Sequence, residues 1–361
     1  MKKIIKLFDP TIDLSERKAL LKTLDSKFWA SGSGSGNVQK FENKFKKYVN
    51  ANSCVAVNSG TAALNLAFSL FNIENKEVIL PSMSFVSTAH AIVENGGIPV
   101  FVDIDPNTLC IDPEKIKKKL SKNTVAICPV HFGGMPCNLD EILEIAKNNK
   151  LQIIEDAAHA VGSKFHQKKI GSHGTAVCFS FHPVKNLAMP TGGLIAINHK
   201  KKTEFQKLLF SRRWCGITDR NDTDYDVKEL GWNYYMNEFS AVIGLEQLKK
   251  LENLNKIRKK IAKEYSNKIN IESKMPFDSD CSYHLYWILV KNRKKFREHL
   301  YKNGIETGTH YKPIHLMKMY KKNISLPVTE SVGKTIVTIP IHPNLKEFEI
   351  RKIIKCINEF S

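Results

Sequence analysis

Acidic, basic and hydroxyl side chains gather at the ends of two short apolar runs in the middle of the chain. The first run, Leu151–Ile154, is followed by Glu155–Asp156, and the second, Ala176–Phe181, is followed by Lys185. Each run is too short for a free-standing helix and has the apolar character of a buried parallel strand. Because ligands in open α/β sheets bind beyond the carboxyl ends of the strands, an acid and an amine at these positions can meet over one small molecule.

An ordinary salt bridge is the simpler interpretation of Asp156 and Lys185, since ion pairs are far commoner than catalytic pairs. A second motif, Ser59–Gly60–Thr61, follows the strand-like Cys54–Val57 and begins an Ala- and Leu-rich helix. The free backbone N–H groups and hydroxyls at such a helix start suit a phosphate, although a plain N-cap explains Ser59 equally well.

Taken together, these residues have the chemistry that pyridoxal 5′-phosphate (PLP) requires. The Ser59–Gly60–Thr61 motif and Ser180 offer a phosphate cradle, Asp156 an acid for the pyridinium nitrogen, and Lys185 an amine for a Schiff base. A lysine just after a buried strand is costly unless it is used or reaches solvent, which favours a functional role.

The surrounding pattern predicts the elements that position these residues. Short apolar strands alternate with helices, which indicates an α/β fold with a mostly parallel sheet covered by helices on both faces. The strands are expected at Cys54–Val57, Glu77–Pro81, Val100–Ile104, Thr124–Val130, Leu151–Ile154 and Ala176–Phe181, with Leu194–Ile197 as an antiparallel strand. The helices between them are expected up to Phe71, over Val86–Asn95, over 113–120 and over 139–148.

The pattern changes at Asn237, where leucines and isoleucines three or four residues apart predict a long amphipathic helix. The strands Ser282–Lys291 and Ile336–Ile339 and the helices Lys294–Asn303 and Leu345–Phe360 then indicate an α+β unit. A chain of 361 residues exceeds the size of most single cores. We therefore expect a large ligand-binding domain, 1–244, and a smaller C-terminal domain, 245–361, with the N-terminal segment packed on the smaller one.

Composition excludes several classes of protein. The net charge of +19 makes a polyanion partner worth considering, but the lysines have no aromatic interleaving or recognised nucleic-acid motif. We predict no nucleic-acid partner and no membrane span, and a cytoplasmic protein. The eight cysteines include no CxxC pair, so neither disulfides nor a metal site is implied. The run SGSGSG at 31–36 lacks the spacing of a dinucleotide fingerprint, and we interpret it as a mobile loop near a ligand.

The ordered motifs resemble a known family. SGTAAL, PSMSF, IIEDAAHAVG, GSHGTAVCFSFHPVKN and LGWNYYM follow one another, with VHFGG at 130–134 and HYKPIHL at 310–316. This series is similar to the DegT/DnrJ/EryC1/StrS group of PLP-dependent sugar aminotransferases, which have the fold of type I PLP transferases. The resemblance extends from about Phe28 to Tyr320.

The resemblance implies a role for each matching residue. Lys185 would form the Schiff base with PLP, Asp156 would hold the pyridinium proton, and Phe85 and the pair Ala158–His159 would lie against the faces of the ring. The other implied contacts are Ser59, Gly60, Thr61, Ser180 and His182 at the phosphate end, Asn233 on the phosphate of the neighbouring subunit, and Trp29, His310 and Tyr311 facing the nucleotide-sugar.

The resemblance further implies a homodimer with shared active sites. Its reaction would move an amino group from glutamate to a keto group of a nucleotide-linked hexose, for polysaccharide or glycan biosynthesis. Two departures affect the substrate: the chain has MPTGG at 189–193 and NYYM at 233–236, where the family commonly has TGEGG and NYRM. Gly133 also stands where many members carry a tyrosine.

Other functions stay open at this point. A cyclitol ketone or a smaller phosphorylated ketone would also fit as the acceptor. A sister branch of the family dehydrates sugars, but its members have histidine in place of the lysine. A regulator that has the fold without turnover is the remaining alternative.

Overall fold

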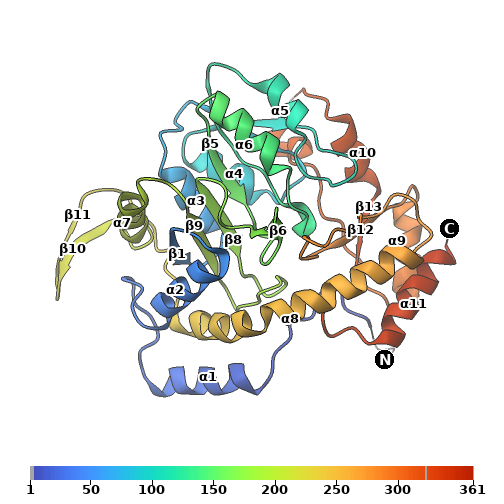
Figure 1. Ribbon diagram of the computed structural model, residues 1–361, viewed down its shortest axis with the longest axis horizontal. Helices are drawn as coiled ribbons and strands as arrows, with labels where there is room; N and C mark the ends of the chain where they lie inside the picture. The colour runs from blue at the N-terminus through green and yellow to red at the C-terminus, as the bar shows by residue number, and fades with distance from the viewer. Residues whose placement is uncertain (1–3, 322, 361) are drawn as a thin grey trace.

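The computed structural model describes residues 4–321 and 323–360. Its centre is a seven-stranded sheet in the order β1-β9-β8-β5-β4-β2-β3 (Figure 1). The strands are β1 (Ser53–Val57), β2 (Glu77–Pro81), β3 (Ile98–Val102), β4 (Thr124–Ile127), β5 (Gln152–Asp156), β8 (Ala176–Ser180) and β9 (Gly193–Ile197). In this sheet β9 is antiparallel to both of its neighbours, β1 and β8, and the remaining neighbours pair in parallel. The α/β fold and the antiparallel strand predicted from the sequence are confirmed.

Helices cover both faces of this sheet, and each face has its own apolar core. One core includes side chains of α3 (Gly60–Ser69), α4 (Ser87–Glu94) and α7 (Lys202–Arg212). The other includes side chains of α2 (Asn37–Val49), α5 (Pro113–Lys119) and α6 (Leu139–Asn148). Because both faces are buried, the strands are apolar throughout instead of alternating.

The C-terminal part is arranged around α8 (Glu238–Lys268), a continuous helix of 31 residues. It includes a two-stranded ribbon of β12 (Tyr286–Leu289) and β13 (Ile336–Ile339). Its other helices are α9 (Arg293–Lys302), η2 (Ile314–Leu316), η3 (Lys318–Tyr320), α10 (Pro327–Thr335) and α11 (Glu347–Asn358). The expected domain limit at 244/245 falls inside α8, so the division into 1–244 and 245–361 stays a proposal.

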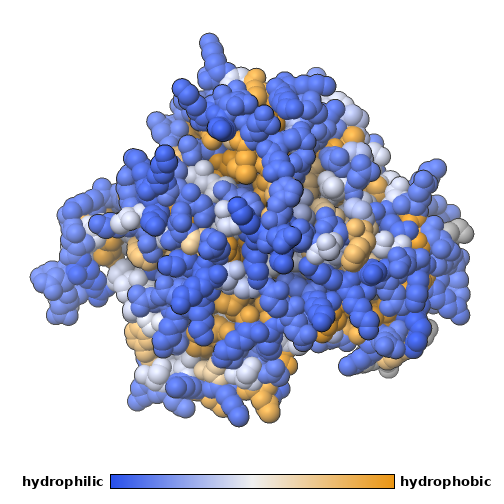
Figure 2. Space-filling view, viewed as in Figure 1, coloured by the Kyte–Doolittle hydropathy of each residue, from blue (hydrophilic) through white to orange (hydrophobic). Residues whose placement is uncertain are grey.

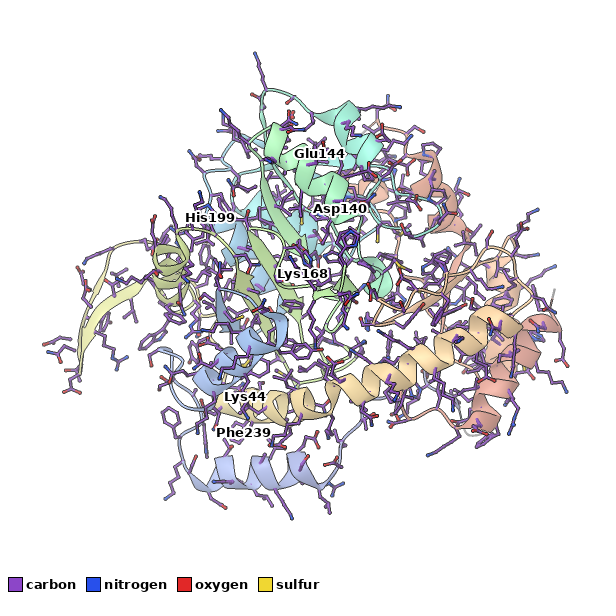
Figure 3. The ribbon with its side chains drawn as sticks, in the orientation of Figure 1. Lys44, Asp140, Glu144, Lys168, His199 and Phe239 are labelled. Carbon is purple, nitrogen blue, oxygen red and sulfur yellow. The ribbon has the colours of Figure 1, made fainter. Side chains whose placement is uncertain are left out.

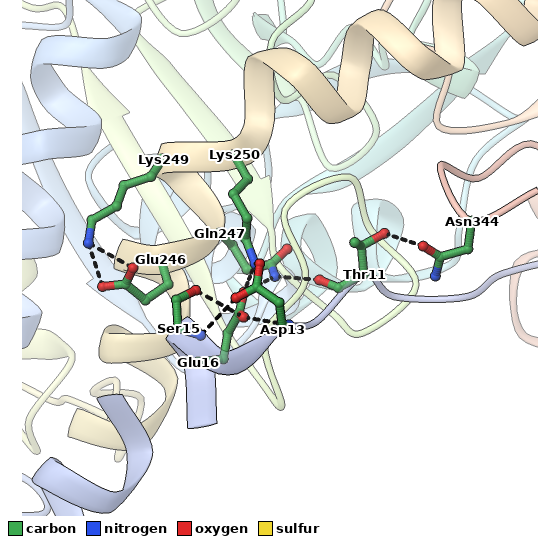
Figure 4. Close-up of polar contacts among 9 residues, drawn as sticks. All are labelled: Thr11, Asp13, Ser15, Glu16, Glu246, Gln247, Lys249, Lys250 and Asn344. Carbon is green, nitrogen blue, oxygen red and sulfur yellow. Dashed lines mark hydrogen bonds and ion pairs between the residues drawn. The ribbon is translucent and has the colours of Figure 1, made fainter. Parts of the chain in front are cut away.

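The N-terminal segment runs along this C-terminal part. Ile5 forms a β-bridge with Ile305, and α1 (Leu14–Asp25) packs against α8. Lys250 of α8 forms an ion pair with Glu16, while Gln247 donates a hydrogen bond to the backbone oxygen of Thr11 (2.8 Å) (Figure 4). The contacts at Thr11 and Glu16 hold the N-terminal segment against α8.

A hairpin of β10 (Ile217–Asn221) and β11 (Asp224–Val227) follows α7 and projects away from the seven-stranded sheet (Figure 1). It contains the Asp-rich stretch Asp219 to Asp226 and is largely exposed. A smaller hairpin of β6 (Lys164–Phe165) and β7 (Lys168–Lys169), a short helix η1 (Phe132–Gly134) and α7 have no counterpart among the elements predicted from the sequence.

The Ser/Gly run at 31–36 is packed against the base of the β10–β11 hairpin. A Cβ atom on Gly32 would lie 2.0 Å from the Trp214 ring, and one on Gly34 would lie 1.9 Å from the guanidinium of Arg213. Arg213 is fully buried and donates to the backbone oxygen of Ser33 (3.0 Å) and to Glu42 (2.6 Å). The glycines are therefore needed for close packing.

The outer surface is largely hydrophilic on the face shown in Figure 2. Exposed charges of both signs cover the helices, including Lys44 of α2 and Asp140 and Glu144 of α6 (Figure 3). Large apolar side chains are also exposed on and beside α1, namely Ile12, Leu14, Leu21, Leu24, Phe28 and Trp29. Among residues 4–321 and 323–360, no helix is long and apolar enough to cross a membrane.

Candidate active site

Asp156 and Lys185 meet at the carboxyl edge of the parallel strands, as the sequence predicted. Asp156 is the last residue of β5, and Lys185 lies in the loop that follows the adjacent strand β8. Both line a cavity of about 370 Å³. Its other lining residues are Ser59, Gly60, Thr61, Leu64, Ser84, Phe85, Ser87, Val130, Ala158, His159, Ser180, His182, Val184, Thr191, Gly192, His310 and Tyr311.

Asp156 is a buried carboxylate with two direct hydrogen bonds. Thr88 of α4 donates its hydroxyl to Oδ2 (2.8 Å), and the backbone N–H of Ala158 donates to Oδ1 (3.1 Å). Burial raises the pKa of Asp156, while these two hydrogen bonds and the charge of Lys185 counteract the rise. The protonation of Asp156 therefore depends on the balance between burial, which favours the neutral acid, and these partners, which favour the carboxylate.

The pKa of Lys185 is lower than that of an ordinary lysine side chain. Burial lowers its pKa to about 8, and the negative charge of Asp156 opposes this effect. Its Nζ atom lies 3.4 Å from Nε2 of His284. The following residue, Asn186, donates hydrogen bonds to Asn255 of α8 (2.9 Å) and to the backbone oxygen of Ser282 (2.8 Å), which anchor the loop. A substantial fraction of the amine is therefore neutral, and nucleophilic, near pH 8.

The N-terminus of α3 and the end of β8 form one end of the cavity. Ser59 caps α3 by accepting the N–H of Ala62 (3.1 Å), so its hydroxyl proton is available to another acceptor. A Cβ atom on Gly60 would lie 2.6 Å from Cβ of Ser180, so only glycine allows this approach. The first N–H groups of the helix and two hydroxyls converge here, which suits a phosphate.

Aromatic side chains form another part of the cavity lining, namely Phe85, His159, His310 and Tyr311. His159 accepts the backbone N–H of Gly133 at Nδ1 (3.2 Å), and its Nε2 lies 3.2 Å from the hydroxyl of Tyr311. Burial, and then the charge of Lys185, lower the pKa of His159 well below its usual value. A neutral ring fixed by two contacts can lie against a planar ligand. Phe85, which is 56% exposed at the mouth, lies with its ring centroid 6.0 Å from that of Tyr311.

Two predicted site residues do not line this cavity. Asn233 lines a neighbouring hollow of about 530 Å³ together with Ser59 and Thr191. Trp29 is half exposed, donates its indole N–H to the backbone oxygen of Leu24 (3.2 Å) and packs near Phe239. The roles assigned to Asn233 and Trp29 stay predictions.

Sequence reasoning missed two residues that contact the central pair. Thr88 belongs to an ordinary-looking helix and has no motif around it. His284 lies in a strand-like apolar run, where a lone histidine is usually a core residue. Neither position has a local pattern that would have distinguished it, because its partner lies far away in the sequence.

The site is not arranged for a metal ion. Within the part of the chain that the structure describes, no three His, Cys, Asp or Glu side chains are grouped so as to hold one. PLP requires a site for its phosphate, an acid and a lysine amine. The cavity offers the N-terminus of α3 at Gly60, the buried Asp156 and Lys185.

Comparison with known proteins identifies similar aminotransferases over nearly the whole chain. The model of the DegT/DnrJ/EryC1/StrS aminotransferase family matches residues 10–358. The chain is 33% identical to the GDP-perosamine synthase of Escherichia coli O157:H7, over 99% of each chain.

Two similar solved structures extend the comparison to the fold. PseC of Helicobacter pylori, an aminotransferase involved in the biosynthesis of pseudoaminic acid, matches with a TM-score of 0.93 and 27% identity, over 99% of each chain. The putative sugar aminotransferase Spr1654 of Streptococcus pneumoniae, in its PLP form, matches with a TM-score of 0.93 and 25% identity, over 99% of this chain and 98% of the other. On the family model and on the fold alike, this chain belongs to the DegT/DnrJ/EryC1/StrS aminotransferase family.

Proposed function

We propose that this protein is a PLP-dependent aminotransferase that moves an amino group, with glutamate as the donor, to a keto group of a nucleotide-linked hexose. The observation that carries this proposal is the convergence of Lys185 and Asp156 on one cavity that is also lined by the N-terminus of α3, where Gly60 approaches Ser180 closely. Surface-polysaccharide or glycan biosynthesis is the process that such an activity would serve.

The residues that line the cavity include the donors and the acid that PLP requires. Ser59, Gly60, Thr61 and Ser180 would hold the phosphate, and Asp156 would pair with the ring nitrogen. When bound, PLP supplies a ring that takes up negative charge from the substrate carbon and a carbon that carries the amino group between the two half-reactions.

The protein's own contribution is to place charges and protons around that ring. The carboxylate of Asp156 would stabilise a proton on the ring nitrogen, and the N–H of Ala158 and the hydroxyl of Thr88 favour the charged form of this carboxylate. The amine of Lys185 has a pKa lowered to about 8. It could take a proton from the donor's carbon in the first half-reaction and give a proton to the acceptor's carbon in the second. His159, held neutral, would stack on the ring and keep water from one face.

His310 and Tyr311 lie at the cavity where the acceptor would enter. The hydrogen bond between Nδ1 of His310 and Thr338 (2.7 Å) fixes the first, and the contact with His159 fixes the second. A cyclitol ketone and a smaller phosphorylated ketone are the alternative acceptors, since the chain lacks the family's usual glutamate and arginine at 189–193 and 233–236.

The decisive experiment follows the absorption spectrum of the purified, PLP-loaded protein. Glutamate should convert the lysine-bound form to the aminated form, and one member of a panel of keto sugars, free and nucleotide-linked, should restore it. A spectrum that glutamate and other amino acids leave unchanged would refute the aminotransferase assignment. Restoration by a cyclitol ketone in preference to any nucleotide-sugar would favour the alternative acceptor.

We also propose a homodimer in which Asn233 of one subunit contacts the phosphate held by its partner. The apolar side chains exposed on and beside α1 support an assembly of two copies. Asn233 also lies beside Ser59 of its own chain, so the experiment has to decide between the two subunits. If each site combines residues of both chains, Lys185→Ala and Asn233→Ala variants that are unfolded and refolded together should recover activity.

The expected recovery follows from random pairing. About half of the dimers are mixed, and one of the two sites in each mixed dimer has both residues intact, so activity should reach about a quarter of the parent's. No recovery, with mixed dimers shown to form by mass spectrometry, would place both residues in one subunit. The cytoplasmic location is part of the same proposal, and cell fractionation tests it.

A further inference from the structure

His284 is a buried histidine that contacts the amine of Lys185. The residue lies two positions before β12 and is 2% exposed. Its Nε2 atom is 3.4 Å from Nζ of Lys185, whereas its Nδ1 atom is buried without a hydrogen-bond partner among the residues that the structure describes. The ring is not part of the cavity lining, although it packs against His159, which is.

The ring is neutral in this environment. Burial, followed by the charge of Lys185, lowers the pKa of His284 well below its ordinary value. Its ring centroid is 4.5 Å from that of His159 and 5.6 Å from that of Phe8, with which it stacks. A neutral imidazole has one N–H donor and one acceptor nitrogen, so the position of the single proton decides what Lys185 meets.

The unpartnered Nδ1 atom indicates where that proton is. A buried N–H without an acceptor is rarer in proteins than an acceptor without a donor. The tautomer with the proton on Nε2 leaves only an acceptor unpaired and directs the N–H at Lys185. Since an ammonium group has no lone pair, only the neutral amine of Lys185 can accept this hydrogen bond.

We propose that His284 donates its Nε2–H to Nζ of Lys185 and thereby holds this amine in the neutral, reactive form. His284 is a positioning residue because it acts through the lysine. The inference deepens the proposed function, which depends on a neutral amine at Lys185, but the contact itself is present without any cofactor or substrate.

The other groups around the amine do not supply this effect. The carboxylate of Asp156 favours the protonated amine. Burial and the charge of Lys185 lower the pKa values of His159, His182 and His310, so these rings are neutral as well. Burial also keeps Tyr311 neutral, because it raises the pKa of the phenol. Burial and the donor from His284 are therefore the two influences that favour the neutral form.

The test measures the protonation of Lys185 in the cofactor-free protein. Trace acetylation with acetic anhydride, carried out across a range of pH and quantified by mass spectrometry, gives the pKa of each lysine, with exposed Lys122 as the internal reference. In His284→Phe the flat ring is kept and the donor is lost. The pKa of Lys185 should rise by about half a unit to one unit, so the ratio of neutral to protonated amine should fall about threefold to tenfold.

Two further variants separate the hydrogen bond from packing. His284→Gln retains an amide donor near the position of Nε2 and should keep the pKa of Lys185 close to that of the parent. Phe8→Leu removes the stacking on His284 and leaves its nitrogen atoms in place, so it should leave the pKa of Lys185 unchanged.

Each outcome decides the proposal. An unchanged or lower pKa of Lys185 in His284→Phe would overturn it, and so would an equal rise in Phe8→Leu. If His284→Phe does not fold, a clear rise in the folded His284→Gln variant would also overturn it. Because the measurement needs neither PLP nor turnover, its failure would leave the proposed aminotransferase reaction standing.

Discussion

Thr88 lowers the pKa of Asp156 through one hydrogen bond, and Thr88→Val removes that bond with little change in shape. The hydroxyl lies 2.8 Å from Oδ2 of Asp156 and 2.7 Å from the hydroxyl of Ser84, and the residue is fully buried. In the variant, the N–H of Ala158 is the direct donor that stays with the carboxylate.

The size of the effect follows from the energy of such a bond. A hydrogen bond to a charged group contributes about 1.5–3 kcal/mol, and one pKa unit corresponds to about 1.4 kcal/mol. Burial already raises the pKa of Asp156, and the hydroxyl of Thr88 lowers it. The pKa of Asp156 in Thr88→Val should therefore rise further, by about one to two units.

The sign of the resulting pH dependence is fixed by the need for a carboxylate. In the proposed reaction, Asp156 would take up a proton as pH falls and would no longer pair with the ring nitrogen by charge, so activity should be lost on the acid side. The acid limb of kcat/KM for glutamate should move to higher pH by about one to two units in Thr88→Val. Activity on the alkaline side of the limb should be retained.

Thr88→Ser is the matched control, because it keeps the hydroxyl and loses only a methyl group. Its acid limb should coincide with that of the parent. A Thr88→Val protein that is folded, binds PLP fully and has an unshifted acid limb would refute the reasoning. A shift of equal size in Thr88→Ser would attribute the effect to packing.

Three further predictions concern the lysine, the acid and a buried ion pair. Lys185→Ala should stay folded, as circular dichroism would show, and should lose the visible absorption of the lysine-bound cofactor; an unchanged spectrum would contradict the assignment. Asp156→Asn should keep PLP but lose most turnover, since an amide cannot hold the ring proton by charge, and near-normal kcat would remove the residue from this role. Arg213→Met leaves Glu42 buried without its partner and should lower the free energy of unfolding by about 3–5 kcal/mol in urea titrations. The exposed control Lys228→Met should leave the midpoint unchanged, and a similar loss in both variants would refute the burial argument.

The sheet could be predicted because its strands are apolar on both faces and end in polar residues. Glu77–Pro81 and Ile336–Ile339 have the predicted limits, and so does the helix 139–148. In contrast, α7 was missed because its lysines and phenylalanines do not segregate to two clear faces. The β6–β7 hairpin was missed because strands of two residues leave no period to detect.

Some residues of the candidate site could likewise be predicted from the sequence, and others could not. Lys185, Asp156 and Ser59 stand at strand or helix ends, so their type and place in the sequence pointed to the cavity. The contacts of Thr88 with Asp156 and of His284 with Lys185 span 68 and 99 positions. Pairings at such separations depend on the folded topology, which no local pattern expresses. The position of Asn233 relative to a second subunit is likewise absent from the order of residues in one chain.

The continuous course of α8 restricts how the length of this chain can change. Along this one helix, Gln247 contacts the N-terminal segment, Asn255 accepts from Asn186 beside Lys185, and Arg258 donates to the backbone oxygen of Ile341. One inserted residue would rotate everything downstream by about 100° and advance it by about 1.5 Å, so these three contacts could not be kept together. The exposed tip of the β10–β11 hairpin does not hold distant parts of the chain in register in this way. Insertions and deletions should therefore be tolerated at that tip and rejected within α8, even where each single substitution on the exposed face of α8 is harmless.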